Sequence, residues 1–325
     1  MNEASAERAS STNSIKKILF FISVFLPFLL CVSCEDKETF PSHSRKMSIV
    51  CPSPFGVRDD VMLRTLVYAI KKTSNITIDV KNISDNDGAK GVDSVLNAPA
   101  DGYTLLFADP SIITTTDAGI TEGYHNLDTI CILSEQPLVL CAPKGRWKDF
   151  AAFTMDYDNS NMTVGTLHYG TNTFRVAKRL CKILDHMLTP ISCADNTAII
   201  KGIEEGRCSV GILPLADYLQ DGNTGVEALV LLTKGHSSHS KMKNVPSIYD
   251  YGYNLEYPGF VFNSILVKQG TDMRIKSALL IIIKKAWNSS EFQHYLETYG
   301  NLKTFSGQET AEAYMEYLIK SYKDK

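Results

Sequence analysis

The feature that most constrains the fold is the alternation of short apolar runs with longer amphipathic segments along the chain. This alternation is typical of βαβ units and predicts the α/β class, with a largely parallel sheet covered by helices. Strands are expected at Met47–Cys51, Ile76–Val80, Thr104–Ala108, Met162–Thr166, Thr189–Cys193, Ser209–Leu213 and Phe260–Val267. Helices are expected at Asp60–Lys71, Ala89–Asn97, Thr173–His186, Thr197–Glu205, Met273–Trp287, Ser290–Tyr299 and Gln308–Tyr322.

The elements form two successive α/β series, which predicts two lobes. A chain of 325 residues is long enough for two hydrophobic cores. We expect residues 47–141 to begin the first lobe and residues 142–263 to form the second. The last helices follow one more strand and need an existing sheet to cover, so residues 264–325 are expected to return to the first lobe.

The first residues have the pattern of an export signal. Lys16 and Lys17 precede an apolar run from Ile18 to Val32, and small Ser33 stands before Cys34. The run is too short for a typical spanning helix and contains a proline. Residues 1–33 are therefore predicted to be a signal peptide. Cys34 is predicted to carry a lipid, with residues 34–46 as a polar tether; plain cleavage without lipidation is the alternative.

The charge and the cysteine content of the chain limit which partners we expect. Removing residues 1–33 takes away three basic and two acidic residues, so 30 basic and 34 acidic residues remain, dispersed along the chain. No clustered basic stripe is present, so no nucleic-acid partner is expected. Six cysteines remain beyond Cys34, and their spacing fits no zinc pattern, so they are either paired in an oxidising compartment or buried as free thiols.

Three loops that end a strand and open a helix are candidate ligand contacts. They are residues 54–59, 168–172 and 194–196. In open α/β sheets ligands bind beyond the carboxyl ends of strands, where helix N-termini favour a carboxylate. The alternative is that these Gly, Ser, Thr and Asn residues are only helix caps and turns.

Several segments resemble, in order, the receptors of tripartite tricarboxylate transporters, the Bug/TctC substrate-binding family. Residues 100–106, Ala-Asp-Gly-Tyr-Thr-Leu-Leu, are similar to that family's PDGYTLL segment. Pro54, Gly56, Asp60 and Arg64 match its P-x-G-G-x-x-D-x-x-x-R run without a gap. Further matches are Gly88, Gly91, Pro137–Leu140, Ile203–Gly206, Asn244–Ser247 and Gly270-Thr271, so the resemblance covers nearly all of residues 47–325.

The resemblance implies a two-lobed periplasmic-binding-protein-like fold, with crossover hinge strands and a ligand cleft between the lobes. It implies an exported, non-enzymatic receptor that passes a small carboxylate, a di- or tricarboxylate or an acidic amino acid, to membrane transporter subunits. Hinges are expected near Cys141–Lys144 and Val261–Ser264, with no cofactor and no metal. The candidate ligand-binding residues are Phe55, Gly56, Asp60, Ser111, Thr166, Tyr169, Gly170, Thr171, Asn172 and Asp195.

The chain departs from the family pattern in its loops. Val57 replaces a second glycine, and Ala194-Asp195 stands where the family often has Lys-Gly. An acidic Asp195 would disfavour a second ligand carboxylate or would pair with a ligand ammonium. These departures leave open a degenerate surface lipoprotein that serves sensing or adhesion. A hydrolase would need a nucleophile or metal constellation; His236 and His239 have HxxH spacing but lie in a polar stretch without a third ligand nearby.

Overall fold

The computed structural model describes residues 40–42, 44–85, 88–108, 126–156, 162–168, 171–184, 188–220, 224–237, 239–255 and 259–323, with side chains to residue 316. The chain divides into two units, residues 1–42 and 43–325. The predicted signal peptide and Cys34 lie outside the described residues. No described helix has the length and apolarity that crossing a bilayer requires.

The unit of residues 43–325 is built on one mixed sheet of nine strands. The strand order is β2-β1-β3-β9-β4-β7-β5-β6, and β8 pairs with β4 beside this path. The strands are β1 (Met47–Cys51), β2 (Ile78–Asn82), β3 (Thr104–Ala108), β4 (Leu127–Pro143), β5 (Thr163–Thr166), β6 (Thr189–Ser192), β7 (Val210–Pro214), β8 (Val226–Leu231) and β9 (Phe260–Lys268).

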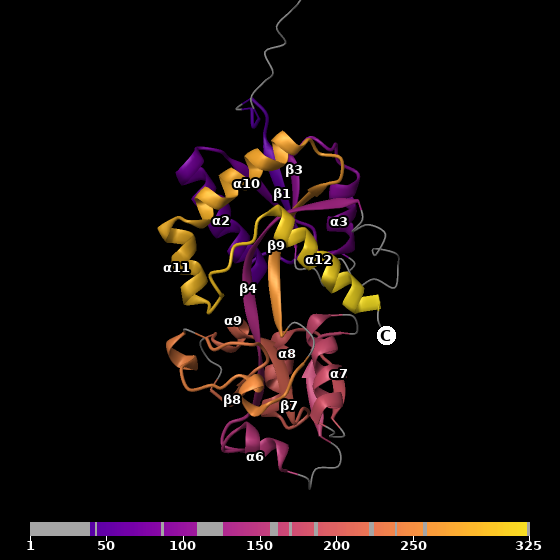
Figure 1. The fold of residues 1–325 in the computed structure, drawn as a ribbon, viewed down its shortest axis with the longest axis vertical. Helices are drawn as coiled ribbons and strands as arrows, with labels where there is room; N and C mark the ends of the chain where they lie inside the picture. Colours follow the sequence, from indigo (N-terminus) through magenta and orange to yellow (C-terminus); the bar gives the residue numbers. More distant parts are fainter. Residues whose placement is uncertain are drawn as a thin grey trace, which may run out of the picture. The chain divides into compact units, whose positions relative to one another are not determined.

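Two long strands, β4 and β9, join the two halves of this sheet (Figure 1). β9 runs antiparallel to both β3 and β4, so the sheet is mixed where we expected a largely parallel one. β4 pairs with β9 up to Pro137 and then, from Leu138, with β7 and β8. The change of partner therefore lies at Pro137–Leu138, and the lobe boundaries given above stay a prediction.

Helices cover both faces of the first half, which contains β1, β2 and β3 (Figure 1). One face carries α2 (Arg58–Ser74), α10 (Met273–Trp287) and α11 (Ser290–Thr298). The other carries α3 (Ala89–Leu96) and α12 (Gln308–Lys323), whose apolar side chains pack on Val50, Leu106 and Leu266. The return of the C-terminal helices to this half brings α10 and α12 onto strands formed early in the chain.

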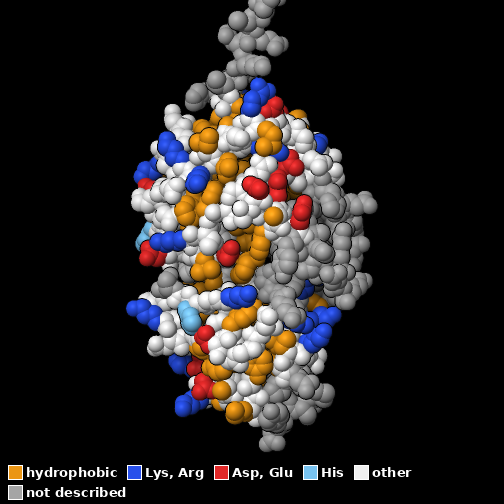
Figure 2. Space-filling view, viewed as in Figure 1, with side chains coloured by type: hydrophobic (Ala, Val, Ile, Leu, Met, Phe, Trp, Pro, Cys, Tyr) orange, Lys and Arg blue, Asp and Glu red, His pale blue; other side chains and the backbone are white. Residues whose placement is uncertain are grey.

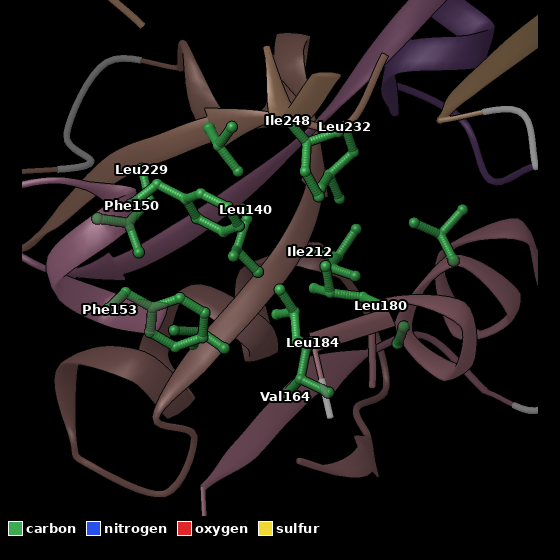
Figure 3. Close-up of a cluster of buried hydrophobic side chains, with 14 of the residues drawn as sticks. Leu140, Phe150, Phe153, Val164, Leu180, Leu184, Ile212, Leu229, Leu232 and Ile248 are labelled. Atoms are coloured by element: carbon green, nitrogen blue, oxygen red, sulfur yellow. The ribbon is translucent and has the colours of Figure 1, made fainter. Parts of the chain in front are cut away.

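In the second half of the sheet, successive residues of β4 point alternately to its two faces. Leu138, Leu140 and Ala142 face one core, which includes residues of α6 (Phe150–Thr154) and α7 (Asn172–Leu184) (Figure 3). Val139 and Cys141 face the other, with α8 (Asn196–Glu204) and α9 (Leu215–Tyr218). Alternate residues of one strand thus support both helical layers, as expected for a strand buried on both faces. Two short 3₁₀ turns, Ser240–Met242 and Ile248–Tyr251, complete this half.

The described cysteines are all free thiols, which answers the question that the sequence left open. Cys51, Cys131, Cys141 and Cys208 are buried, and Cys181 and Cys193 are partly buried. Burial raises the pKa of Cys181 to about 11, so the thiol form is favoured. The cysteines therefore behave as small apolar core residues in this structure.

Candidate functional site

The loop between β1 and α2 is folded onto the carboxylate of Asp60. Gly56 has φ +82°, a conformation that favours glycine, and its N–H donates to Asp60 Oδ2 at 2.9 Å. Arg64 Nε donates to the same oxygen at 2.9 Å, and Asn82 Nδ2 donates to Oδ1 at 2.9 Å. Burial alone would raise the pKa of Asp60, but these hydrogen bonds outweigh it and lower the pKa. The matched Gly56, Asp60 and Arg64 of the sequence motif therefore order the loop together.

Phe55 stands at the tip of this loop. Its side chain is 75 % exposed, and the Arg64 guanidinium lies 4.9 Å from its ring centroid. Asp60, in contrast, is fully buried. Of the candidate residues in this loop, Phe55 and Gly56 are exposed. Asp60 is buried and orders the loop by accepting its hydrogen bonds.

At the end of this loop, where α2 begins, Arg58 connects the two halves of the sheet. Arg58 Nη1 donates to Asp217 Oδ2 at 2.9 Å, across from α2 to α9. The same atom donates to Gln136 Oε1 on β4 at 2.5 Å. Asp59 Oδ1 accepts from Arg58 Nη2 at 3.0 Å and from Asn263 Nδ2, on β9, at 3.3 Å. The Arg58 guanidinium thus links α2, α9 and the crossover strand β4. Asp59 connects it to the second crossover strand, β9.

We call the set Arg58, Asp59, Gln136, Asn196 and Asp217 the bridging cluster. Its three charged side chains are only 13–18 % exposed. Burial opposes the charge of Arg58, but Asp59 and Asp217 outweigh it and raise the pKa of Arg58. Burial raises the pKa of Asp217; the Arg58 charge offsets this only in part, and the Asp59 charge adds to it. One cation therefore faces two partly buried carboxylates.

Asn196 attaches the third candidate loop to this cluster. It is the first residue of α8, and its Nδ2 donates to Asp217 Oδ2 at 3.1 Å. The neighbouring Asp195 is the N-cap of α8, where its side chain accepts from Ala198 N at 2.7 Å. Asp195 is exposed and acts as a cap in this structure, which is the alternative reading that we gave for such residues.

The described candidates around α7 are buried, and their side chains donate hydrogen bonds to backbone carbonyls of their own loop or of β9. Thr166 Oγ1 donates to Leu167 O at 2.6 Å, and Thr171 Oγ1 donates to His168 O at 2.8 Å. Asn172 Nδ2 donates to Phe260 O at 2.5 Å, which ties the start of α7 to the start of β9. Ser111, Tyr169 and Gly170 lie outside the described residues. These bonds hold the loop beside the crossover strand.

Arg58, Asp59 and Asp217 were not on our list of candidates. Arg58 and Asp59 lie in the first candidate loop, and Asp217 is the third residue after β7 ends. A rule that takes every charged residue just beyond a strand's carboxyl end would have found all three.

Two further kinds of site were raised by the sequence: a metal site at His236 and His239, and a basic surface for nucleic acid. His236 Nε2 lies 2.8 Å from Asp250 Oδ2, and no group of three metal-ligating side chains occurs among the described residues. Figure 2 shows Lys and Arg side chains scattered among acidic ones on the face that it presents. The described surface on this face thus has no concentrated basic patch of the kind that nucleic acids require.

Comparison with known proteins adds sequence and structural relatives. The chain is 22% identical to Protein BugT of Bordetella pertussis over 280 residues, which is 81% of this chain and 82% of BugT. It is similar to a TctC solute binding protein from Polaromonas, with TM-score 0.73 and 18% identity over 87% of this chain and 98% of that chain. It is also similar to MatC from Rhodopseudomonas palustris with bound malate, with TM-score 0.69 and 17% identity over 86% and 98%. No family model matches the chain. The likeness to solved structures confirms the expected periplasmic-binding-protein-like α/β fold.

Proposed function

Because the chain belongs with the Bug and TctC solute-binding proteins in both sequence and fold, we propose that it is an extracytoplasmic receptor for a small carboxylate. The similar TctC protein is a solute binding protein, and we propose that this chain is likewise a receptor and not an enzyme. The bound ligand would pass to the membrane subunits of a tripartite tricarboxylate-type transporter. The observation that carries the proposal is the bridging cluster, in which Arg58, a carboxylate-binding side chain, contacts both halves of the sheet beside the crossover strands.

The chemistry of the cluster suits this role. A guanidinium binds a carboxylate through two parallel hydrogen bonds, and a partly buried site strengthens such bonds. Arg58 lies at the N-terminus of α2, where the helix dipole also favours an anion. MatC, a protein of similar fold, holds malate. We therefore propose that the ligand carboxylate binds between the first loop, with Phe55 and Gly56, and the loops that precede α7 and α8.

Lobe closure is the proposed coupling between binding and transport. In hinge-type receptors the two domains close around the ligand, and the closed form is recognised. Because β4 and β9 both cross between the halves, bending at these strands would separate α2 from α9 in an open form, and closure around the ligand would restore their contact. Small-angle X-ray scattering should show a smaller radius of gyration with saturating ligand. An unchanged radius with bound ligand would refute closure.

A thermal-shift screen of the purified protein against di- and tricarboxylates, acidic amino acids and aromatic acids tests the receptor proposal. A ligand that binds only the folded state must raise the melting temperature, by an amount that grows with its concentration. A saturable rise with one class of acid would support the receptor. No rise with any acid, for a folded and ligand-free sample, would refute it and favour the degenerate surface lipoprotein.

We further propose that the protein is anchored to a membrane by lipid on Cys34. The basic residues, the apolar run and the small Ser33 before Cys34 support this. Mass spectrometry of the N-terminal peptide should find Cys34 as the first residue with an added diacylglyceryl mass. Replacing Cys34→Ser should release the protein from the membrane fraction. An unmodified N-terminus would instead show plain export.

A further inference from the structure

The bridging cluster carries an excess of negative charge. Its two carboxylates, Asp59 and Asp217, both contact the same guanidinium, so the charged side chains sum to one negative charge. Asp59 accepts from Ser53 as well as from Asn263, which fixes it on the first half of the sheet. Asp217 is fixed on the second half by Asn196. The excess charge is therefore held in place from both sides.

This excess of negative charge disfavours the binding of a simple dicarboxylate. A ligand carboxylate that approaches Arg58 must share it with two carboxylates already bound, and a second ligand carboxylate would add further repulsion. A zwitterion adds no net charge. Its carboxylate can face the guanidinium while its ammonium faces the two aspartates, so each ligand charge meets an opposite one.

A second observation points independently to a hydrogen-bond donor. The Oδ1 atom of Asn196 is buried and has no hydrogen-bond partner among the described residues. Because Asp217 accepts from this amide, the nitrogen must face the aspartate, and the oxygen is left as an acceptor. A buried acceptor without a donor is costly, and such groups in native proteins usually meet a ligand or a water. Only a donor can satisfy this oxygen; an ammonium can donate to it, and a carboxylate cannot.

We infer that the ligand carries a cationic amino group beside its carboxylate, with the carboxylate on Arg58 and the ammonium held by Asp59, Asp217 and Asn196 Oδ1. The inference rests on the proposed receptor function and narrows its ligand to an α-amino acid or a similar zwitterion. Arg58 and Asp217 exchange part of their mutual ion pair for ligand contacts. The two halves of the sheet then remain bridged through the ligand.

The test compares acids that differ only in the amino group. Melting temperatures of the purified protein are measured against aspartate and succinate, glutamate and glutarate, and leucine and 4-methylpentanoate. At least one amino acid should raise the melting temperature at a concentration about tenfold lower than its amine-free counterpart. If the amine-free acid binds equally or more tightly in every pair, the inference is wrong and the receptor proposal stands. If no acid of any class binds, both fall.

Two variants assign the effect to these side chains. Asp217→Asn keeps an acceptor for Arg58 and removes one charge, so the preference for the amino acid should fall about tenfold or reverse. Asn196→Ala removes the free acceptor and also the donor that fixes Asp217, so it should weaken binding of the amino acid more than binding of the amine-free acid. Asp149→Asn is the matched control, because Asp149 is an exposed N-cap of α6 in the same half and asparagine also caps. A preference unchanged in both test variants, or altered equally in the control, would overturn the assignment.

Discussion

Replacing Asp60→Asn should destabilise the first loop by removing the acceptor on which three donors converge. The carboxylate is fully buried and accepts from Gly56, Arg64 and Asn82 at 2.9 Å each. Asparagine has one oxygen, so its amide nitrogen must face either Asn82 or the Gly56 and Arg64 donors. The variant therefore loses a charge-assisted bond and brings two donors together.

The magnitude follows from these contacts. A hydrogen bond to a charged group contributes about 1.5–3 kcal/mol, and a buried donor left unpaired costs about 1–3 kcal/mol. Because the Arg64 side chain is 43% exposed, water replaces most of its contribution. We expect a loss of about 3 kcal/mol in the free energy of unfolding, or roughly 4–6 °C in melting temperature for a protein of this size.

Circular dichroism melts measure this change, with Asp79→Asn as the control. Asp79 is exposed on β2, so its variant should stay within about 0.5 kcal/mol of the native protein. Because the pKa of Asp60 is lowered in the folded state, its contribution is present above the ordinary aspartate pKa and is lost as the pH falls through the lowered value. The two proteins should converge in acid. Equal melting temperatures of both variants at neutral pH would refute the proposed role of Asp60.

Three further predictions concern stability and reactivity. Gly259→Ala should unfold the protein or lower its melting temperature strongly, because an added Cβ would lie 1.3 Å from Leu232 O; Gly235→Ala, where nothing lies within 4 Å, should melt normally. Asp195→Ala should cost about 1 kcal/mol in chemical denaturation through loss of the α8 cap, whereas Asp195→Asn should cost little. Burial raises the pKa of Cys208 to about 11 and of Cys51 to about 12, so iodoacetamide at neutral pH should label both far more slowly in the folded than in the urea-unfolded protein; equal rates would contradict their burial.

Much of the fold was predictable from local pattern. The bounds expected for β3 and α10 agree with the structure, since both follow clear apolar periodicity between turn residues. The long strand β4 was not predicted. Its apolar run contains Pro137, which usually argues against a central strand, and here the proline lies where the pairing partner changes.

The candidate site was predictable only in part. The loops at the carboxyl ends of β1 and β6 were both given as candidate ligand contacts, and the bridging cluster joins Arg58 of the first to Asn196 of the second through Asp217. The pairing of Arg58 with Asp217 was not predictable, because these residues are 159 positions apart and meet only through the arrangement of the two halves. Periodicity and turn chemistry report local structure and contain no information about that distance.

The position of β9 delays completion of the first half of the sheet during synthesis. This strand, residues 260–268, lies between β3 and β4, which are both made much earlier in synthesis. Until it arrives, β3 and the first part of β4 each have an open edge in the middle of the future sheet. The first half therefore cannot complete its sheet before more than three quarters of the chain has been made. The first half thus stays incomplete for most of synthesis, and an incompletely folded chain is one that can be threaded through a narrow translocation channel.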